Sequence, residues 1–179
     1  MQLAIHTKYL HAIRQEYGKN QRTYDCQRPL PMLDAVIQES MRLWPPVLFA
    51  SQRVTPPSGL RIKDTFIPGN TIVMIPPFAV NRDPRNFLRP DEFIPERWTT
   101  KRELVLNENV AIPFNTGPYS CAGKGLAYME LRSVIARVVD EFDVCLPDDF
   151  SAERYWDGVK DHFSSGPPRQ TVSFVRVKS

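Results

Sequence analysis

Proline sets the tightest limit on how this chain folds. The sequence contains 17 prolines among 179 residues, about twice the ~5% share of an average protein. Proline lacks a backbone N–H and clashes with the preceding helical turn, so it ends helices and disfavours the interior of sheets. Paired prolines occur at positions 45–46, 56–57, 76–77 and 167–168. We therefore expect few helices, separated by ordered and extended connections.

The bulk composition is typical of one soluble globular domain. Hydrophobic residues make up 42% and charged residues 24% of the chain. The net charge of +3 does not indicate the concentrated basic face that binds nucleic acid. Cys26, Cys121 and Cys145 stand far apart without a C-x-x-C pair, which argues against a zinc ribbon or a disulfide framework and favours a reducing compartment. No stretch reaches the ~20 apolar residues of a membrane span.

Helical periodicity marks three segments. Apolar spacing predicts a first helix that ends near Gly18, and a second that has Pro31 in its first turn and ends before the prolines at 45–46. A polar linker, residues 19–28, joins these two. The strongest helical pattern follows Gly123, and its apolar stripe comprises Ala127, Leu131, Val134, Ile135, Val138 and Phe142.

Extended and irregular segments fill the rest of the chain. Residues 62–67 and 71–75 are short β-rich runs between proline- and glycine-containing turns, and residues 81–108 form a polar meander. Residues 161–177 alternate around Gly166-Pro167-Pro168, which predicts a terminal hairpin. The expected fold is mainly α with small β hairpins.

The loop before the third helix carries the strongest chemical signal. Cys121 sits where free backbone N–H groups and the helix dipole favour an anion. Gly117 permits a tight turn, Gly123 leaves no side chain where a flat cofactor would press against the backbone, and Phe114 is placed to pack beside the sulfur. This pattern suits a thiolate bound to a metal centre. A buried, inert cysteine at a helix start fits the loop equally well.

The whole loop resembles the haem-binding signature of cytochrome P-450 enzymes, F-x-x-G-x-[R/H]-x-C-x-G. Phe114, Gly117, Cys121 and Gly123 match its spacing, and the run from 124 to 132 is similar to fungal members. The resemblance implies that Cys121 is the axial ligand to the iron of haem b and that the matched residues surround the cofactor. Tyr119 stands where many relatives carry the Arg or His that meets a haem propionate; a phenol donates a hydrogen bond but brings no charge.

Arg53 follows the second predicted helix at a position where the family often has a propionate-binding arginine. An exposed strand arginine remains an equally good interpretation. No ligand role is expected for the other two cysteines.

Two further motifs bear on the interior of the fold. Glu39 and Arg42 are spaced i,i+3, which by itself indicates a surface pair worth ~0.2–0.5 kcal/mol. Their flanking sequence resembles the family's E-x-x-R helix, and Pro95-Glu96-Arg97-Trp98 resembles its P-E-R-F segment. The resemblance implies that Glu39, Arg42 and Arg97 form a buried ionic triad with a structural role. Residues 81–84 are similar to the family's H-R-D-P stretch, with Asn81 in place of His.

The resemblance implies a haem-thiolate monooxygenase that inserts one oxygen atom from O₂ into a small hydrophobic organic substrate, with electrons from an NADPH-dependent reductase. Residues 47–51 and 163–165 match substrate-facing segments of the family, although plain packing explains them as well. A basic face for an acidic partner, or an ordinary solvated face, is formed by Lys101, Arg102, Lys124 and Arg132.

The resemblance covers nearly the whole chain but only part of a P-450 enzyme. Relatives carry, upstream, a membrane anchor, the helices that roof the substrate pocket and a central oxygen-activating helix; no such motif precedes Leu30. We therefore expect residues 1–179 to be the C-terminal portion of a single P-450 domain, without the catalytic oxygen-activation residues. The full-length family belongs to the endoplasmic reticulum membrane, and this chain by itself is expected to be soluble or cytoplasmic. A non-catalytic remnant, or a haem-thiolate isomerase or peroxygenase, remains an alternative.

Overall fold

The computed structural model describes residues 1–179 except 19–29, 50–51 and 178–179. The expected linker with Cys26, and the end of the 47–51 segment, lie outside the described residues. The α-helices are α1 Gln2–Ile5, α2 Thr7–Gly18, α3 Pro31–Leu43, α4 Pro77–Val80, α5 Lys124–Glu141 and α6 Ala152–Asp157. The short 3-10 turns are η1 Pro95–Trp98, η2 Arg102–Leu104, η3 Glu108–Val110 and η4 Gly117–Tyr119. The described residues include no helix long and apolar enough to cross a membrane.

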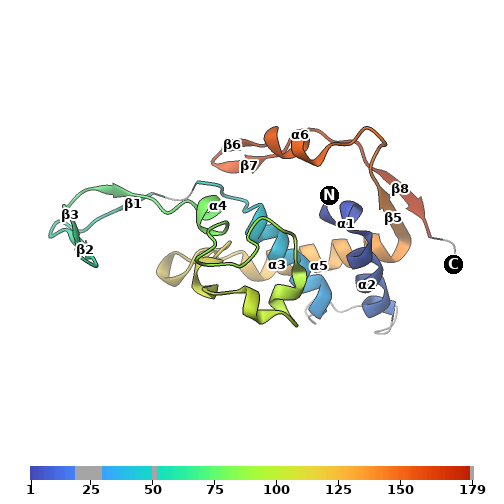
Figure 1. The fold of residues 1–179 in the computed structure, drawn as a ribbon, viewed down its shortest axis with the longest axis horizontal. Coiled ribbons are helices and arrows are strands. Elements are labelled where there is room, and N and C mark those ends of the chain that lie inside the picture. The colour runs from blue at the N-terminus through green and yellow to red at the C-terminus, as the bar shows by residue number, and fades with distance from the viewer. Residues whose placement is uncertain (19–29, 50–51, 178–179) are drawn as a thin grey trace.

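Helices α2, α3 and α5 pack together and hold the core (Figure 1). Each fully buried aliphatic side chain contributes ~1.5–3 kcal/mol. The α3 helix begins at Pro31, whose missing N–H costs nothing in a first turn. The buried core residues are Tyr9, Leu10, Ile13, Tyr17, Leu30, Leu33, Val36, Ile37, Met41, Leu43, Phe93, Ala136 and Val139. The expected stripe on α5 is correct in part: Leu131 and Ile135 pack against the core, but the fully buried positions are Ala136 and Val139, and Val134 is 61% exposed.

Arg14 on α2 closes the carboxyl end of α5. Its Nε donates to the Val139 carbonyl at 2.6 Å, and Nη2 donates to the Phe142 carbonyl at 3.0 Å and to Asp143 Oδ1 at 2.7 Å. A cation at this end complements the helix dipole and satisfies carbonyls that have no partner within the helix. The helix therefore stops at Glu141, and Phe142 starts a strand instead of extending the helical stripe.

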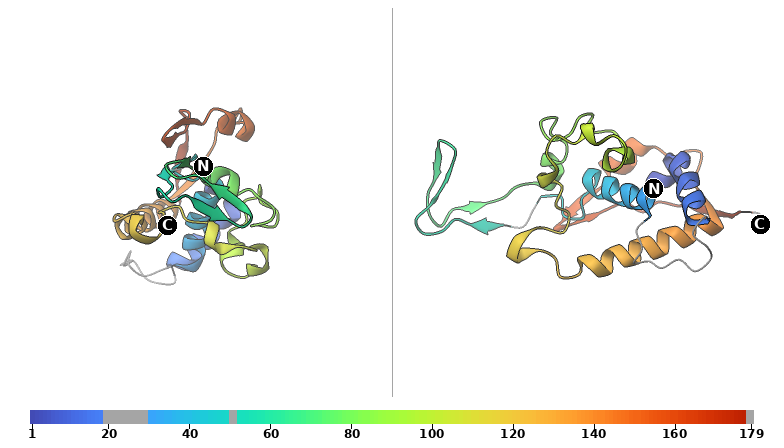
Figure 2. Two further views of the ribbon diagram at one scale, coloured as in Figure 1. Left: turned by 90° about the vertical axis from the view of Figure 1, so that its left-hand side faces the viewer. Right: turned by 90° about the horizontal axis from the view of Figure 1, so that it is seen from below.

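Four short strands build an arm that projects from the helical body (Figures 1 and 2). Strand β1 Arg53–Val54 pairs with β4 Ile72–Val73, and β2 Leu60–Ile62 pairs with β3 Thr65–Ile67, both antiparallel. The β-rich run expected over residues 62–67 is therefore two strands joined by a turn at Lys63, which has φ 51°. We define residues 53–73 as the arm.

The C-terminal region corrects the expected terminal hairpin. The hairpin consists of β6 Lys160–His162 and β7 Ser164–Gly166, and it turns at Phe163 instead of at the prolines. Prolines 167 and 168 cannot donate to a ladder, so the chain leaves the hairpin there. The final strand, β8 Ser173–Arg176, pairs instead with β5 Phe142–Cys145 next to the end of α5.

Candidate functional site

Glu39, Arg42 and Arg97, which we call the ion cluster, meet between α3 and the meander. All three are buried, with exposures of 0%, 1% and 0%. Arg42 donates from Nε and Nη2 to the two Glu39 oxygens, each at 2.9 Å, and Arg97 Nε donates to Glu39 Oε1 at 2.9 Å. The Ile94 amide and the Trp98 indole N–H also donate to this carboxylate, both at 2.9 Å. The carboxylate is therefore saturated with donors, as a buried charge requires.

The remaining guanidinium N–H groups of the ion cluster bind the backbone of the meander. Arg42 donates to the carbonyls of Asn81, Pro90 and Glu92 at 2.8, 2.6 and 3.1 Å. Arg97 donates to the carbonyls of Leu88, Arg89, Glu92 and Leu104 at 3.0 to 3.5 Å. Burial lowers the pKa of the Arg97 guanidinium from its usual value, and the charge of Glu39 opposes that shift. The cluster thus holds an irregular segment whose carbonyls have few partners of their own.

Asn81 adds a contact that the sequence did not reveal. Its side-chain Nδ2 donates to the Arg42 carbonyl at 3.1 Å, while its own carbonyl accepts from Arg42 Nη1 at 2.8 Å. This two-way link joins the end of α4 to the last turn of α3. The only signal in the sequence was the similarity of residues 81–84 to H-R-D-P, which names the segment but not this contact. The Trp98 indole bond to Glu39 was missed in the same way.

Residues 114–123, the cysteine loop, fold back on themselves before α5. The Cys121 amide donates to the Phe114 carbonyl at 2.8 Å, and the Ser120 amide donates to the Gly117 carbonyl at 3.0 Å across η4. Gly117 has φ +65°, a left-handed backbone conformation that residues other than glycine rarely adopt. The tight turn expected at Gly117 is therefore present, and Cys121 lies just before the N-terminus of α5.

Cys121 itself is exposed and carries a free thiol. Its carbonyl accepts from the Lys124 amide at 3.2 Å, so it lies immediately before the 18-residue helix α5. A Cβ built on Gly123 would lie 3.7 Å from the sulfur and would meet no other atom within 4 Å. The space beside the sulfur is therefore open. Cys121 is therefore not buried in this structure, contrary to that part of the alternative interpretation of the loop.

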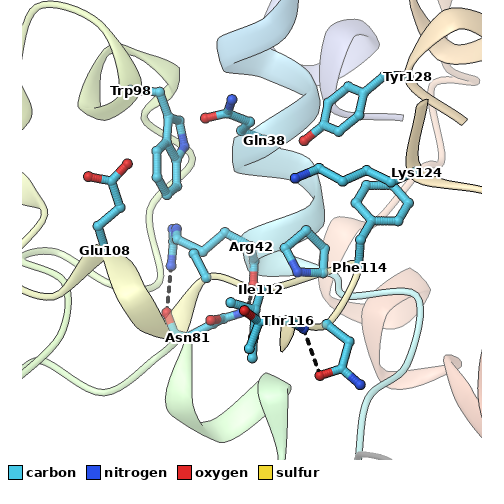
Figure 3. Close-up of a pocket in the computed structure, with 13 residues that line it drawn as sticks. Gln38, Arg42, Asn81, Trp98, Glu108, Ile112, Phe114, Thr116, Lys124 and Tyr128 are labelled. Atoms are coloured by element: carbon cyan, nitrogen blue, oxygen red, sulfur yellow. Dashed lines mark hydrogen bonds between the residues drawn. The ribbon is translucent and has the colours of Figure 1, made fainter. Parts of the chain in front are cut away.

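Phe114 packs on the first turns of α5, with its ring centroid 5.4 Å from that of Tyr128. Behind the loop lies an open pocket of about 330 Å³, drawn in Figure 3. Trp98 and Glu108 line its meander side, and Lys124 and Tyr128 line its α5 side. Cys121 does not line this pocket. The ring of Phe114 therefore packs on the start of α5 and lines this pocket.

Arg53 and Tyr119 meet although one belongs to the arm and the other to the cysteine loop. The Arg53 guanidinium carbon lies 4.8 Å from the centroid of the Tyr119 ring. In Figure 2 the base of the arm and the cysteine loop lie at the same end of α5. The structure thus brings together the two residues that sequence resemblance marked as propionate contacts.

The donor set around Cys121 suits a metal that already has other ligands. Among the described residues, no group of three or more His, Cys, Asp or Glu side chains is placed to hold a metal ion. A bare zinc site needs about four protein ligands, whereas a haem iron takes four nitrogens from its own ring and needs one axial thiolate. One exposed thiol, open space at Gly123 and a cation at Arg53 fit that second arrangement.

Of the two segments expected to face the substrate, residues 163–165 are bonded to the residue just before the segment 47–51. The Ser165 amide of β7 donates to the Pro46 carbonyl at 2.7 Å. Phe49 and Phe163 are 59% and 67% exposed beside this link, so the pair of segments presents aromatic surface instead of burying it.

The expected basic face is only partly free. Arg132 forms a two-bonded ion pair with Asp34 on α3, at 2.6 and 3.0 Å. Arg102 pairs with Glu108 at 2.6 Å. These two charges are matched within the chain, which leaves Lys101 and Lys124 as the cations of this set that form no ion pair among the described residues.

Comparison with known proteins assigns the family. A family model for cytochrome P450 matches residues 1–168. The chain therefore belongs to the cytochrome P450 family, and the resemblance seen in the sequence is confirmed at this level.

The similar relatives are fungal. The chain is 44% identical over 147 residues to the cytochrome P450 monooxygenase FCK2 of Fusarium pseudograminearum, covering 82% of this chain and 27% of that protein. It is 43% identical over 168 residues to the cytochrome P450 monooxygenase phqL of Penicillium fellutanum, covering 93% and 30%. It is 39% identical over 153 residues to the tryprostatin B 6-hydroxylase of Aspergillus fumigatus, covering 86% and 27%. The chain thus spans less than a third of the length of these relatives.

Proposed function

We propose that this chain is the C-terminal portion of a haem-thiolate monooxygenase and that Cys121 is the axial ligand to the iron of haem b. The observation that carries the proposal is the placement of Cys121, an exposed thiol at the start of α5 in a loop with open space beside the sulfur. Phe114, Gly117, Tyr119, Gly123 and Arg53 are the further cofactor contacts of this proposal.

Each part of the chain has a distinct task in this proposal. The start of α5 positions Cys121, whose carbonyl accepts from the Lys124 amide at 3.2 Å. The Cys121 amide bond to Phe114 and the turn at Gly117 fix the direction of the sulfur. The ion cluster acts at a distance from the thiol, by holding the meander against α3. Haem b bound at Cys121 would supply the iron chemistry that inserts one oxygen atom of O₂ into an organic substrate.

The reaction partners follow from the same proposal. The electrons come from an NADPH-dependent reductase, for which Lys124, directly after the cysteine loop, and Lys101 on the meander offer cations without an ion pair among the described residues. The substrate is a small hydrophobic organic molecule, and the exposed aromatic side chains at Phe49 and Phe163 favour an apolar ligand. By family resemblance, the full-length protein associates with the endoplasmic reticulum membrane.

The test is the ferrous–carbon monoxide spectrum of the protein loaded with haem. The red-shifted absorption band of thiolate ligation is expected in the wild type. It is also expected in Cys145→Ser, the matched control, because Cys145 is likewise an exposed thiol in the wild type. Cys121→Ser should lose this band because a serine hydroxyl does not replace a thiolate on iron. A band that persists in Cys121→Ser would overturn the assignment of the ligand.

A further inference from the structure

The contact between Arg53 and Tyr119 joins two parts of the fold that share no secondary structure. Arg53 lies on β1, where it is in register with Val73 of β4. Tyr119 ends the 3-10 turn η4, two residues before Cys121. The guanidinium stands 4.8 Å from the centre of the phenol ring, well within the range in which an aromatic face attracts a cation.

The ring of Tyr119, not its hydroxyl, makes this contact. The side chain of Tyr119 is 71% exposed, which is unusual for a large aromatic residue with no packing role. Arg53 donates from Nη1 to the neighbouring Gln52 carbonyl at 2.9 Å. Within the described ranges, no carboxylate lies at ion-pair distance from Arg53. The aromatic face is therefore the contact from outside the arm that defines where this charge sits.

We propose that Tyr119 is a positioning residue that holds the Arg53 guanidinium at the rim of the cysteine loop, where it receives a carboxylate of the cofactor. This inference rests on the proposed function of Cys121. A ring face occupies one side of the guanidinium plane and leaves its edge N–H groups free to donate to a carboxylate.

A tyrosine at this position has a clear electrostatic consequence. An arginine or protonated histidine at residue 119 would bring a second positive charge next to Arg53, and like charges repel. The phenol ring attracts Arg53 instead.

The experiment measures how fast haem leaves the loaded protein for an excess of a haem-scavenging apoprotein. An exposed contact of this kind is worth ~0.5–1 kcal/mol, which is about a two- to fivefold change in rate. Tyr119→Leu should therefore lose haem about two- to fivefold faster, whereas Tyr119→Phe should behave as the wild type because it keeps the ring. Arg53→Gln should lose haem at least as fast as Tyr119→Leu. Arg61→Gln removes an exposed arginine from β2 of the same arm and should change nothing.

The double variant separates positioning from independent binding. If Tyr119 acts through Arg53, Tyr119→Leu combined with Arg53→Gln should be no faster than Arg53→Gln alone. The proposal would be overturned if the double variant lost haem at a rate raised by the product of the two single effects. It would also be overturned if Tyr119→Phe lost haem as fast as Tyr119→Leu. A wild type without the thiolate band would instead refute the proposed function.

A second measurement needs no cofactor. In nuclear magnetic resonance spectra, ring currents of Tyr119 should shift the Arg53 side-chain protons, and Tyr119→Leu should remove that shift while Tyr119→Phe keeps it. Arg53 resonances that do not respond to Tyr119→Leu would overturn the contact itself.

Discussion

The ion cluster lies beside α3, and the cysteine loop lies at the start of α5. The polar groups of the ion cluster all have partners within the chain, whereas the thiol of the cysteine loop is exposed to solvent. In the ion cluster, Glu39 accepts five hydrogen bonds and every N–H of Arg42 and Arg97 is used, with all three residues nearly inaccessible to water. In the cysteine loop, the backbone is ordered by bonds to Phe114 and Gly117, yet the thiol of Cys121 is exposed.

This contrast distinguishes residues that stabilise the fold from residues that the fold presents to a ligand. A buried carboxylate between two guanidiniums is stable only if its partners all come from the chain itself, because an unpaired buried charge is costly. An exposed thiol has no such requirement, so its value lies in what binds to it. Mutations in the two regions should therefore differ in their effect on stability.

The largest effect is expected for Glu39→Gln. The amide cannot neutralise the buried guanidiniums of Arg42 and Arg97, so the free energy of unfolding should fall by ~3–5 kcal/mol. Urea unfolding followed by circular dichroism measures this loss. The matched control is Glu108→Gln, which breaks an ion pair with Arg102 that is 61% and 51% exposed and should cost less than ~1 kcal/mol. Equal losses in the two variants would refute the contrast between the regions.

An intermediate effect, dependent on pH, is expected for Tyr9→Phe. The Tyr9 hydroxyl donates to Glu96 Oε2 at 2.8 Å and so joins α2 to the residue next to Arg97. Losing this bond should cost ~0.5–1.5 kcal/mol at neutral pH.

Tyr9 also predicts how stability changes at alkaline pH. Burial, and then the hydrogen bond to Glu96, raise the pKa of Tyr9 above its usual value. The unfolded chain then loses the proton near pH ~10 while the native chain keeps it, so this contribution is complete below pH ~10 and is lost as pH rises towards the native pKa. Urea unfolding measured from pH 9 to 11 should show that the free energy of unfolding declines less steeply with pH in Tyr9→Phe than in the wild type, by up to ~1.4 kcal/mol per pH unit. Parallel declines in the two proteins would contradict the raised pKa.

The smallest effect on stability is expected for Cys121→Ser. Because the thiol is exposed and its amide bond to Phe114 is kept, the free energy of unfolding without cofactor should change by less than ~0.5 kcal/mol. The same urea experiment measures it, with Cys145→Ser as the comparison. A loss as large as that of Glu39→Gln would mean that the cysteine loop is part of the folding core.

The sequence predicted what depends on local spacing. Pro31 and the prolines at 45–46 bound α3 closely, and the turn at Gly117 is present as expected. The resemblance also selected the three residues that meet in the ion cluster, because charged side chains in fixed motifs mark positions that recur in a family. It did not indicate the carbonyls that complete the cluster, since any residue type supplies a carbonyl.

Contacts between distant segments were the main omissions. Strand β8 pairs with β5 across the α6 region, and alternation within residues 161–177 gave no means of choosing that partner over a local hairpin. The buried positions of α5 differ from the predicted ones for a related reason. Ala136 lies in the core beside residues of α2, and a pattern within α5 alone cannot indicate where α2 packs. The meeting of Arg53 and Tyr119 depends on where the arm lies, which neither segment specifies alone.

The bonds from Arg42 and Arg97 to the meander have a consequence for how order is detected in this protein. Hydrogen exchange reports whether an amide proton is bonded, but the two arginines hold carbonyl oxygens such as those of Leu88, Arg89 and Pro90. Amides of the same segment are bonded as well: the Leu88 amide donates to the Leu104 carbonyl at 2.9 Å, and the Ile94 amide donates to Glu39 Oε1 at 2.9 Å. Slow exchange is therefore expected at these two amides, and it should become faster when the ion cluster is disrupted.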